Sequence, residues 1–549
     1  MKKATVALLL VLAAVACSSS PAPSKPAAPP PVVNPTPTPG PMSRIDPTVV
    51  EETETYVIRA LPKSDYKKVG DHSIKHPLLA KPMEYFKEDD KYYYVYFPKS
   101  LPEEIAAAPG GQSGATAAPA AVPTPASPGM AVSTKDVSPG VSMSDFTDIA
   151  PPRVPGTLRL EKVADPGLPA DGMWRASFVV ADVNGDGIPD IVSPPNRAGN
   201  GQLRVWIGNG KGSFSPMPLT FTDQDGKPLG HFSINYGAVA VGDIDGDGKM
   251  DIVSASHSGG VVSLFGDGKG GFRVVRAGLP SSFSSQAITL LDADGDGKLD
   301  IVAARDIGEL VNGAVDKTQV RVFLYRGAQG WEWKKEGIVG GFASISLHGL
   351  DYEKNGRQSV LAGSNYTGAL TLLWRSVGDG TFEPVQFDGL ELYAFHFTTQ
   401  PGTFGKAHVP AFADAYFSQA NLPTPTRAVG ISVYSFEQGK WTRHRAWRKL
   451  ESKASVTAMA VGDLDGDGLD DIVFADNEQR KVRVLFQQPD GSFAEMDEKL
   501  EPSISSLGQW LCLADLDGDG RPDIVLSRTV SSSAPHEKGG FDVYLNKGK

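Results

Sequence analysis

Residues 463–473 read Asp-Leu-Asp-Gly-Asp-Gly-Leu-Asp-Asp-Ile-Val. Aspartates at the first, third, fifth and ninth positions are spaced so that their carboxylates can converge on one point, and the glycine at the sixth position permits the sharp turn that this requires. The backbone carbonyl of the seventh residue supplies one more oxygen. Because a shell of hard oxygen ligands suits Ca²⁺, the stretch predicts a calcium loop that leads directly into a strand at its apolar end.

The same loop occurs five times in the chain. An EF-hand is the alternative, but it needs an acidic residue at the twelfth position, where the five copies have Ser193, Ser254, Ala303, Phe474 and Leu526. We therefore predict loops that bind about five Ca²⁺ ions, the seventh residue of each contributing its carbonyl. The predicted ligands are Asp182, Asn184, Asp186, Ile188, Asp190, Asp243, Asp245, Asp247, Lys249, Asp251, Asp292, Asp294, Asp296, Lys298, Asp300, Asp463, Asp465, Asp467, Leu469, Asp471, Asp515, Asp517, Asp519, Arg521 and Asp523.

The spacing of the loops predicts one repeat array over residues 156–549. The wide gap between the third and fourth loops leaves room for two more units: a degenerate copy that begins at Asp351, and a unit whose stretch 398–408 has no carboxylate. In each unit a strand precedes the loop, a second follows it, and a Gly-rich hairpin such as 208–214 joins a third strand to a fourth. Such small sheets cannot bury both faces alone, so seven of them predict a mainly β fold, a seven-bladed β-propeller.

The ends of the array indicate how the ring closes. The last unit stops after its third strand, at residues 541–545, and an unpaired candidate strand, residues 157–163, precedes the first unit. An open sheet edge in the ring would be a site for aggregation. We therefore predict that residues 157–163 supply the outer strand of the seventh blade.

The pattern Asp-x-Asp/Asn-x-Asp-Gly-x-x-Asp resembles the loops of FG-GAP/VCBS repeat proteins, which include integrin α-subunit propellers and fungal propeller lectins. The resemblance covers residues 156–549. It implies a calcium-binding propeller that recognises proteins or glycans, with no metal carried over to the fourth and fifth blades, which depart from the pattern. The formal net charge of −11 is explained by the nineteen aspartates at ligand positions, and no basic block indicates nucleic acid.

The N-terminus has the features of a bacterial lipoprotein signal peptide over residues 1–17. Two lysines precede an apolar run, and Ala14-Val15-Ala16-Cys17 resembles a lipobox, so we expect lipidation at Cys17. By resemblance to bacterial lipoproteins, Ser18 implies an outer-membrane lipoprotein that faces the periplasm or the cell surface.

Three further segments precede the array. We expect a Pro-rich linker at 18–42, a small α+β or β module with a tyrosine-rich strand at 43–105, and a disordered Ala/Pro linker at 106–155. We also expect the protein to be a monomer.

The common sequence-local signatures of hydrolases, zinc enzymes, redox proteins and NTPases are missing, and we predict no catalytic residue. We expect a lipid-anchored calcium propeller that binds a protein or glycan ligand at the cell envelope, in adhesion or scaffolding. The alternative is a carbohydrate-active enzyme that resembles polysaccharide lyases, or a lectin, so enzymatic activity stays open. Two histidines in the metal-free blades, His348 and His396, are expected to be packed core residues.

The predicted topology also places the ligand-binding face. The metal loops and the Gly-rich hairpins emerge on one face of the ring, so the connections between strands 2 and 3, and between blades, emerge on the other. Long insertions on that second face predict recognition. The expected contact residues are Tyr416, Phe417, Asn421, Arg528 and His536.

Overall fold

A computed structural model describes seven short strands between residues 49 and 98 and most of residues 147–548. Residues 156–157, 175–176, 198–200, 258, 306–309, 312–313, 316–318, 339–343, 365–370, 387–393, 419–426 and 531–536 are not described. The predicted signal peptide with Cys17, the linker 18–42 and residues 106–146 also lie outside the described residues. Apart from one 3-10 turn, Gly327–Gln329, every regular element in the described part is a strand. No helix in that part is long and apolar enough to cross a membrane.

The strands between residues 49 and 98 form two small sheets. One has the order β1 (Val49–Glu52), β2 (Tyr56–Pro62), β7 (Tyr92–Pro98) and β6 (Lys87–Glu88), and the other has the order β3 (Lys67–Gly70), β4 (Ser73–Lys75) and β5 (Met83–Glu84). The tyrosine-rich strand β7 pairs with β2 in antiparallel register over seven residues.

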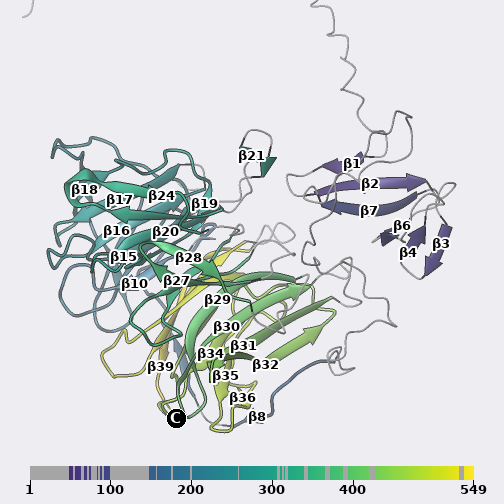
Figure 1. Ribbon diagram of the computed structural model, residues 1–549. Coiled ribbons are helices and arrows are strands. Elements are labelled where there is room, and N and C mark those ends of the chain that lie inside the picture. Colours follow the sequence, from purple (N-terminus) through teal and green to yellow (C-terminus); the bar gives the residue numbers. More distant parts are fainter. Residues whose placement is uncertain are drawn as a thin grey trace, which may run out of the picture. The chain divides into compact units, whose positions relative to one another are not determined.

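Seven four-stranded blades follow (Figure 1). Blade 1 comprises β10 (Val179–Ala181), β11 (Asp190–Ser193), β12 (Arg204–Gly208) and β13 (Phe214–Pro216). Blade 2 comprises β15 (Gly237–Gly242), β16 (Asp251–Ser256), β17 (Gly260–Gly266) and β18 (Gly271–Val275), with β14 (Thr220–Thr222) added in parallel to β18. Blade 3 comprises β19 (Ser285–Leu291), β20 (Asp300–Arg305), β23 (Val320–Tyr325) and β24 (Trp331–Lys334), with the hairpin β21 (Leu310–Val311) and β22 (Ala314–Val315) inserted between β20 and β23.

The remaining blades repeat the same antiparallel order. Blade 4 comprises β25 (Leu347–Leu350), β26 (Ser359–Ala362), β27 (Leu373–Gly378) and β28 (Thr381–Pro384). Blade 5 comprises β29 (Ala394–Phe404), β30 (Val409–Ser418), β31 (Ala428–Glu437) and β32 (Lys440–Leu450). Blade 6 comprises β33 (Met459–Gly462), β34 (Asp471–Asp476), β35 (Lys481–Gln487) and β36 (Phe493–Met496), and blade 7 comprises β37 (Leu507–Ala514), β38 (Asp523–Thr529), β39 (Gly540–Asn546) and β9 (Leu160–Lys162).

The ring closes as predicted. The first strands of consecutive blades contact one another, and β10 of blade 1 contacts both β15 of blade 2 and β37 of blade 7. The outer strand of blade 7 is β9, which pairs antiparallel with β39, so both ends of the array meet in one sheet. The predicted seven-bladed β-propeller is confirmed.

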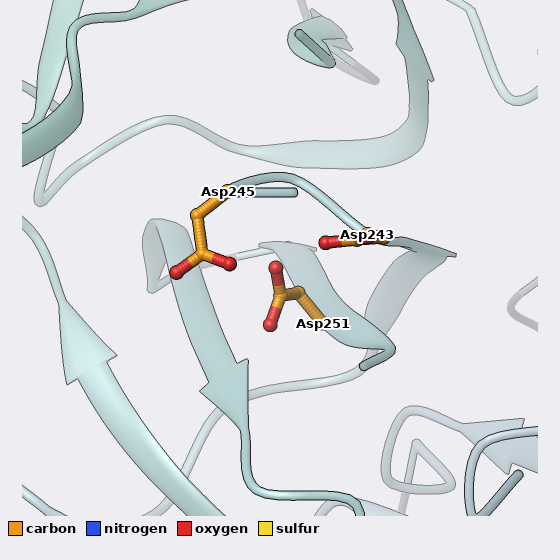
Figure 2. A group of neighbouring side chains, drawn as sticks. All are labelled: Asp243, Asp245 and Asp251. Carbon is orange, nitrogen blue, oxygen red and sulfur yellow. The ribbon is translucent and has the colours of Figure 1, made fainter. Parts of the chain in front are cut away.

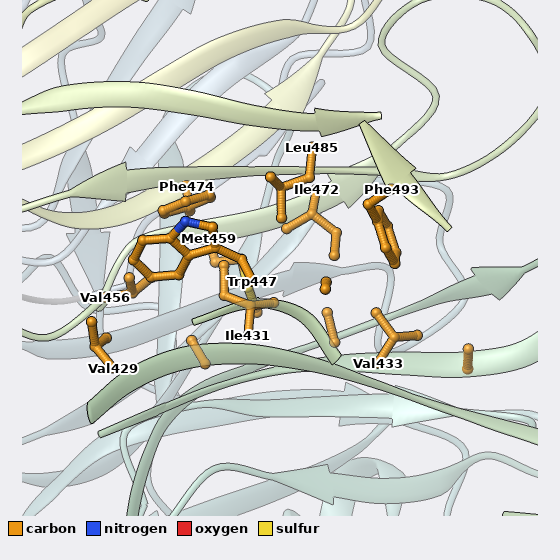
Figure 3. Close-up of a cluster of buried hydrophobic side chains, with 14 of the residues drawn as sticks. Val429, Ile431, Val433, Trp447, Val456, Met459, Ile472, Phe474, Leu485 and Phe493 are labelled. Atoms are coloured by element: carbon orange, nitrogen blue, oxygen red, sulfur yellow. The ribbon is translucent and has the colours of Figure 1, made fainter. Parts of the chain in front are cut away.

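Packing between blades explains the apolar pair that follows each loop. Figure 3 shows the cluster between blades 5 and 6, where Ile431 and Trp447 meet Ile472 and Phe474. Because successive side chains of a strand point to opposite faces, Val473, which lies between Ile472 and Phe474, belongs instead to the cluster between blades 6 and 7. Each of the other five interfaces has its own cluster, so the middle strands are buried on both faces.

The propeller begins earlier than the sequence indicated. Residues 147–155, which we expected in the disordered linker, pair with the outer strands of two blades: Ile149 bridges Arg448 in blade 5, and β8 (Arg153–Val154) adds in parallel to β36 of blade 6. Arg153 donates from Nη1 to the buried Glu501 carboxylate at 2.7 Å. A two-residue strand held by one guanidinium has no periodic pattern in the sequence. The Pro-rich composition therefore led us to place the start of the propeller too late in the chain.

Candidate metal-binding loops

Each predicted loop joins the first two strands of its blade and is shaped by hydrogen bonds to its first aspartate. In blade 6, Asp463 accepts through Oδ1 from the N–H groups of Gly466 and Asp467, at 2.8 and 3.2 Å, and through Oδ2 from Gly468 at 2.9 Å. Gly466 and Gly468 have φ of 78° and 87°, a backbone region that residues other than glycine rarely adopt. The other four loops repeat these bonds, so the nine-residue sequence alone specifies the turn.

The ninth aspartate connects the loop to the third strand. Asp471 is fully buried and accepts from the N–H of Leu464 through Oδ2 and from the N–H of Gln487 through Oδ1, both at 3.0 Å. Equivalent pairs of bonds occur in blades 1, 2, 3 and 7. The ninth carboxylate, at the start of the second strand, therefore couples the loop to the third strand in these five blades.

Burial raises the pKa of this ninth carboxyl in all five loops. The pKa of Asp471 rises to about 8, those of Asp251 and Asp300 rise to about 7, that of Asp523 rises to about 6, and that of Asp190 rises as well. Burial removes the water that would stabilise the anion, and neighbouring carboxylates disfavour it further. A cation bound beside the ninth carboxylate would offset both effects.

The first, third and ninth side chains converge in four of the loops. In blades 2, 3, 6 and 7 one oxygen of each lies within 4.8 Å of the other two. Figure 2 shows Asp243, Asp245 and Asp251 of blade 2 pointing toward one another. In blade 1 the third position is Asn184, whose amide oxygen accepts from the N–H of Asp186 at 2.9 Å. The donor set is made of oxygen atoms alone, which fits a hard divalent cation.

The fifth aspartate of each loop is not among these converging side chains. All five are exposed, and each accepts the N–H of the seventh residue through Oδ1, as Asp467 does from Leu469 at 2.8 Å. In blade 2 the other oxygen of Asp247 lies 2.8 Å from Lys249 Nζ. Of the predicted side-chain ligands, the structure thus brings together positions one, three and nine.

The degenerate loop of blade 4 keeps the same backbone without the buried carboxylate. Asp351 accepts from the N–H groups of Asn355 and Gly356 at 3.0 and 2.8 Å, and Lys354 adopts the left-handed φ of 54° that glycine has in the other loops. Ser359 at the ninth position accepts from the N–H of Ser376 through Oγ at 3.2 Å. Hydrogen bonds can therefore hold this turn by themselves, and blade 4 is an internal reference for the five carboxylate loops.

The predicted ligand contacts on the other face are not supported. Tyr416 and Phe417 are only 3% and 7% exposed, because β30 continues to Ser418 and holds both rings inside blade 5. Arg528 is 5% exposed and forms an ion pair with Asp542 at 2.8 Å. Asn421 and His536 lie outside the described residues. Tyr416, Phe417 and Arg528 are therefore buried strand residues that pack within the protein, and their side chains are not available to a ligand at the surface.

The two histidines of blades 4 and 5 have different surroundings. His396 is 1% exposed, and its Nδ1 lies 2.8 Å from Oδ2 of the fully buried Asp414, as expected for a packed core histidine. His348 is partly exposed and stacks on Trp510 of blade 7, with ring centroids 6.4 Å apart. Desolvation lowers the pKa of His348 to about 4, so it is neutral at physiological pH.

The sequence comparisons agree with this geometry. The FG-GAP-like repeat matches residues 196–254, 243–303 and 430–526, which omits the stretch containing blade 4. The chain thus carries FG-GAP-like repeats, and its class is that of the seven-bladed β-propellers. No curated protein matches it. Among solved structures, one described as "Crystal structure of BBS1N in complex with ARL6DN, soaked with lead" is 12% identical, with a TM-score of 0.40, and the match covers 71% of this chain and 96% of that one.

Proposed function

We propose that the protein is a calcium-stabilised propeller, anchored in the bacterial outer membrane by lipid on Cys17, that binds a protein or glycan ligand at the cell envelope in adhesion or scaffolding. The observation that carries the calcium assignment is the convergence of three carboxylates in each of four loops. A propeller with FG-GAP-like repeats fits a ligand-binding or scaffolding role. The lipid anchor is supported by the sequence Ala14-Val15-Ala16-Cys17.

The oxygen-only donor set favours calcium over a transition metal, because no histidine or cysteine takes part in the four groups. Calcium also tolerates the irregular, many-ligand geometry of a flexible Asp/Gly loop better than magnesium does. Since each ninth aspartate bonds to the third strand, a bound ion would stabilise the blade as a whole. In this proposal the metal is structural and the ligand binds elsewhere.

The enzymatic alternative receives no support from the buried pair formed by His396 and Asp414 in blade 5. His396 and Asp414 are 1% and 0% exposed, so neither can exchange a proton with a polysaccharide at the surface. A general acid or base must lie within hydrogen-bond reach of its substrate. A binding role is therefore the function that the described residues support best.

Two measurements test the proposal. Metal analysis of the purified chain, dialysed against buffered Ca²⁺, should find about five calcium ions per chain, and zero or one would contradict it. Labelling of growing cells with an alkyne-bearing fatty acid should tag the intact protein but not the Cys17→Ser variant. Equal labelling of the two proteins would mean that the lipid is on another residue, and labelling of neither would contradict the lipid anchor.

The residue that follows the third strand of the blade places a positive charge beside two of the loops. It follows the residue whose N–H bonds to the ninth aspartate, and it is Arg326 in blade 3 and Lys547 in blade 7. Arg326 Nη1 lies 2.7 Å from Oδ2 of Asp294, and Lys547 Nζ lies 2.5 Å from Oδ2 of Asp517. The equivalent residues of blades 1, 2 and 6 are Asn209, Asp267 and Gln488. In blades 3 and 7 a side chain of this protein thus already neutralises the third aspartate, which is one of the converging carboxylates.

We expect these two loops to bind Ca²⁺ more weakly than those of blades 2 and 6, because the ion must displace or tolerate a positive charge. Arg326→Gln and Lys547→Gln should each strengthen one site. Half-exposed ion pairs contribute about 0.2–1 kcal/mol, so the Kd should fall by up to about five-fold. The reciprocal change Gln488→Arg should weaken one site by a similar factor. Calcium titration of the full chain against a chromophoric chelator measures all three, and unchanged isotherms would refute the assignment.

A further inference from the structure

A pocket of about 270 Å³ lies beside blade 1, near its interface with blade 7. Its walls come from the connection that leads from β9 into β10, from the connection after β11, and from β12. The lining residues are Pro169, Asp171, Trp174, Pro195, Asn196, Gln202, Arg204 and Trp206. We call it the seam pocket. It lies on the face that the topology predicted for ligand binding, but at residues that the sequence did not single out.

The apolar walls of the seam pocket are fixed before any ligand arrives. Trp174 donates from Nε1 to the carbonyl of Asp171 at 2.7 Å. Trp174 and Trp206 pack edge to face with centroids 5.9 Å apart, and Phe541 of blade 7 packs on both rings at 5.0 and 5.7 Å. Both tryptophans are more than nine-tenths buried, so only the edges of their rings line the pocket, and their packing prevents a change of rotamer. A preformed wall reduces the entropy lost on binding.

The polar groups at the rim are free to meet a ligand. Asp171, Gln202 and Arg204 are exposed. Among the described residues, the guanidinium of Arg204, the amide of Gln202 and the indole N–H of Trp206 have no hydrogen-bond or ion-pair partner. Apolar walls with a few convergent polar groups are the usual composition of a small-molecule site.

The signs of the rim charges decide which ligand fits. An anion would be attracted by Arg204 and repelled by Asp171. A cation would be attracted by Asp171 and repelled by Arg204. Hydroxyl groups satisfy both, because each can donate to the carboxylate while it accepts from the guanidinium or the indole. A sugar ring offers several hydroxyls around its edge and apolar C–H groups against the Trp and Pro walls. The volume of about 270 Å³ is slightly below the usual range of ligand pockets, about 300–1,000 Å³, which suits one ring rather than an extended peptide.

We propose that the seam pocket binds one neutral sugar residue of a glycan, with Arg204, Trp206 and Asp171 making the polar contacts. This inference rests on the proposed ligand-binding function and names its ligand class. It assigns recognition to the junction of the two ends of the repeat array, where the ring is completed, and separates the ligand site from the calcium loops.

The test uses the full mature chain and saturation-transfer NMR. The probes are the methyl glycosides of galactose, mannose and N-acetylglucosamine, with glucuronate and a blocked tripeptide as comparators. At least one neutral glycoside should give a signal that falls about five-fold or more in Arg204→Ala and in Trp206→Phe, since each removes a hydrogen bond at the pocket. Trp206→Phe keeps an aromatic ring in the wall. Arg159→Ala, which removes an arginine whose side chain is 71% exposed outside the pocket, should leave the signal unchanged.

The outcomes separate this inference from the proposed function. Absence of a signal for every neutral glycoside, equal binding by the two pocket variants and the parent, or a signal from glucuronate or the tripeptide alone would each overturn it. Calcium content and melting temperature are measured on the same samples. Calcium content should stay at the parent value in all three variants. The melting temperature should stay at the parent value in Arg204→Ala and Arg159→Ala, and should fall in Trp206→Phe because a buried ring is made smaller. A chain that holds its calcium but fails the glycoside test keeps the metal assignment and loses the sugar pocket.

Discussion

Removal of calcium is expected to lower the free energy of unfolding of the propeller by about 7 kcal/mol. If each loop binds with a Kd of roughly 10⁻⁴ M and free Ca²⁺ is roughly 10⁻³ M, one site adds about 1.4 kcal/mol, and five such sites add about 7. That sum is comparable to the whole stability of an ordinary domain. Without metal, the buried ninth carboxylates keep only their backbone hydrogen bonds, while the repulsion from the neighbouring aspartates remains. Thermal and urea unfolding with and without a calcium chelator measure the difference.

A pair of single substitutions isolates one site. Asp465→Ala removes the proposed ligand at the third position of the blade 6 loop. Glu353→Ala makes the matched change in the blade 4 loop, which has Ser359 in place of the ninth aspartate. The first variant should bind one ion fewer and lose about 1.4 kcal/mol of stability in calcium, whereas the second should change neither. If chelation leaves the unfolding curve of the parent unaltered, or if both variants behave alike, the loops are ordinary hydrogen-bonded turns.

Loss of the closing strand should be the most damaging single change to the fold. We expect a chain in which residues 157–163 are replaced by a Gly-Ser segment of equal length to aggregate or to melt far below the parent. The segment carries β9, which pairs with β39, and Leu158, which is 1% exposed in the cluster between blades 6 and 7. Its replacement leaves β39 as an open edge and removes a buried leucine, a change that by itself costs about 2–5 kcal/mol.

Size-exclusion chromatography and thermal melting compare this variant with a chain that lacks residues 21–41. The Pro-rich segment is predicted to be a spacer, so its deletion should leave the melting temperature of the propeller unchanged. Leu158→Ala is the gentler variant and should remain monomeric while it loses part of the stability. A replacement chain that is monomeric and melts with the parent would show that blade 7 does not need a strand from the N-terminal end of the array.

The features that the sequence by itself determined are those encoded within a short run of residues. The turn of each candidate metal-binding loop is specified within nine residues, because its hydrogen bonds join the first aspartate to N–H groups at most five positions away. The apolar pair after the loop and the Gly-rich hairpin are equally local, so the number of blades and the order of strands could be predicted. The closing strand could also be predicted, because the seventh unit lacked a fourth strand and the candidate strand at residues 157–163 belonged to no unit.

Only the tertiary structure decided which side chains reach the surface and which distant residues meet. Tyr416 and Phe417 look like loop residues in the sequence, but the longer strands of blade 5 bury them. Arg326 lies 32 positions from the aspartate it neutralises, and Arg153 lies 348 positions from its partner Glu501. The seam pocket draws its walls from three segments that only the folded chain brings together. Such contacts depend on how the blades pack and on where strands end, and no local pattern of residue types records either.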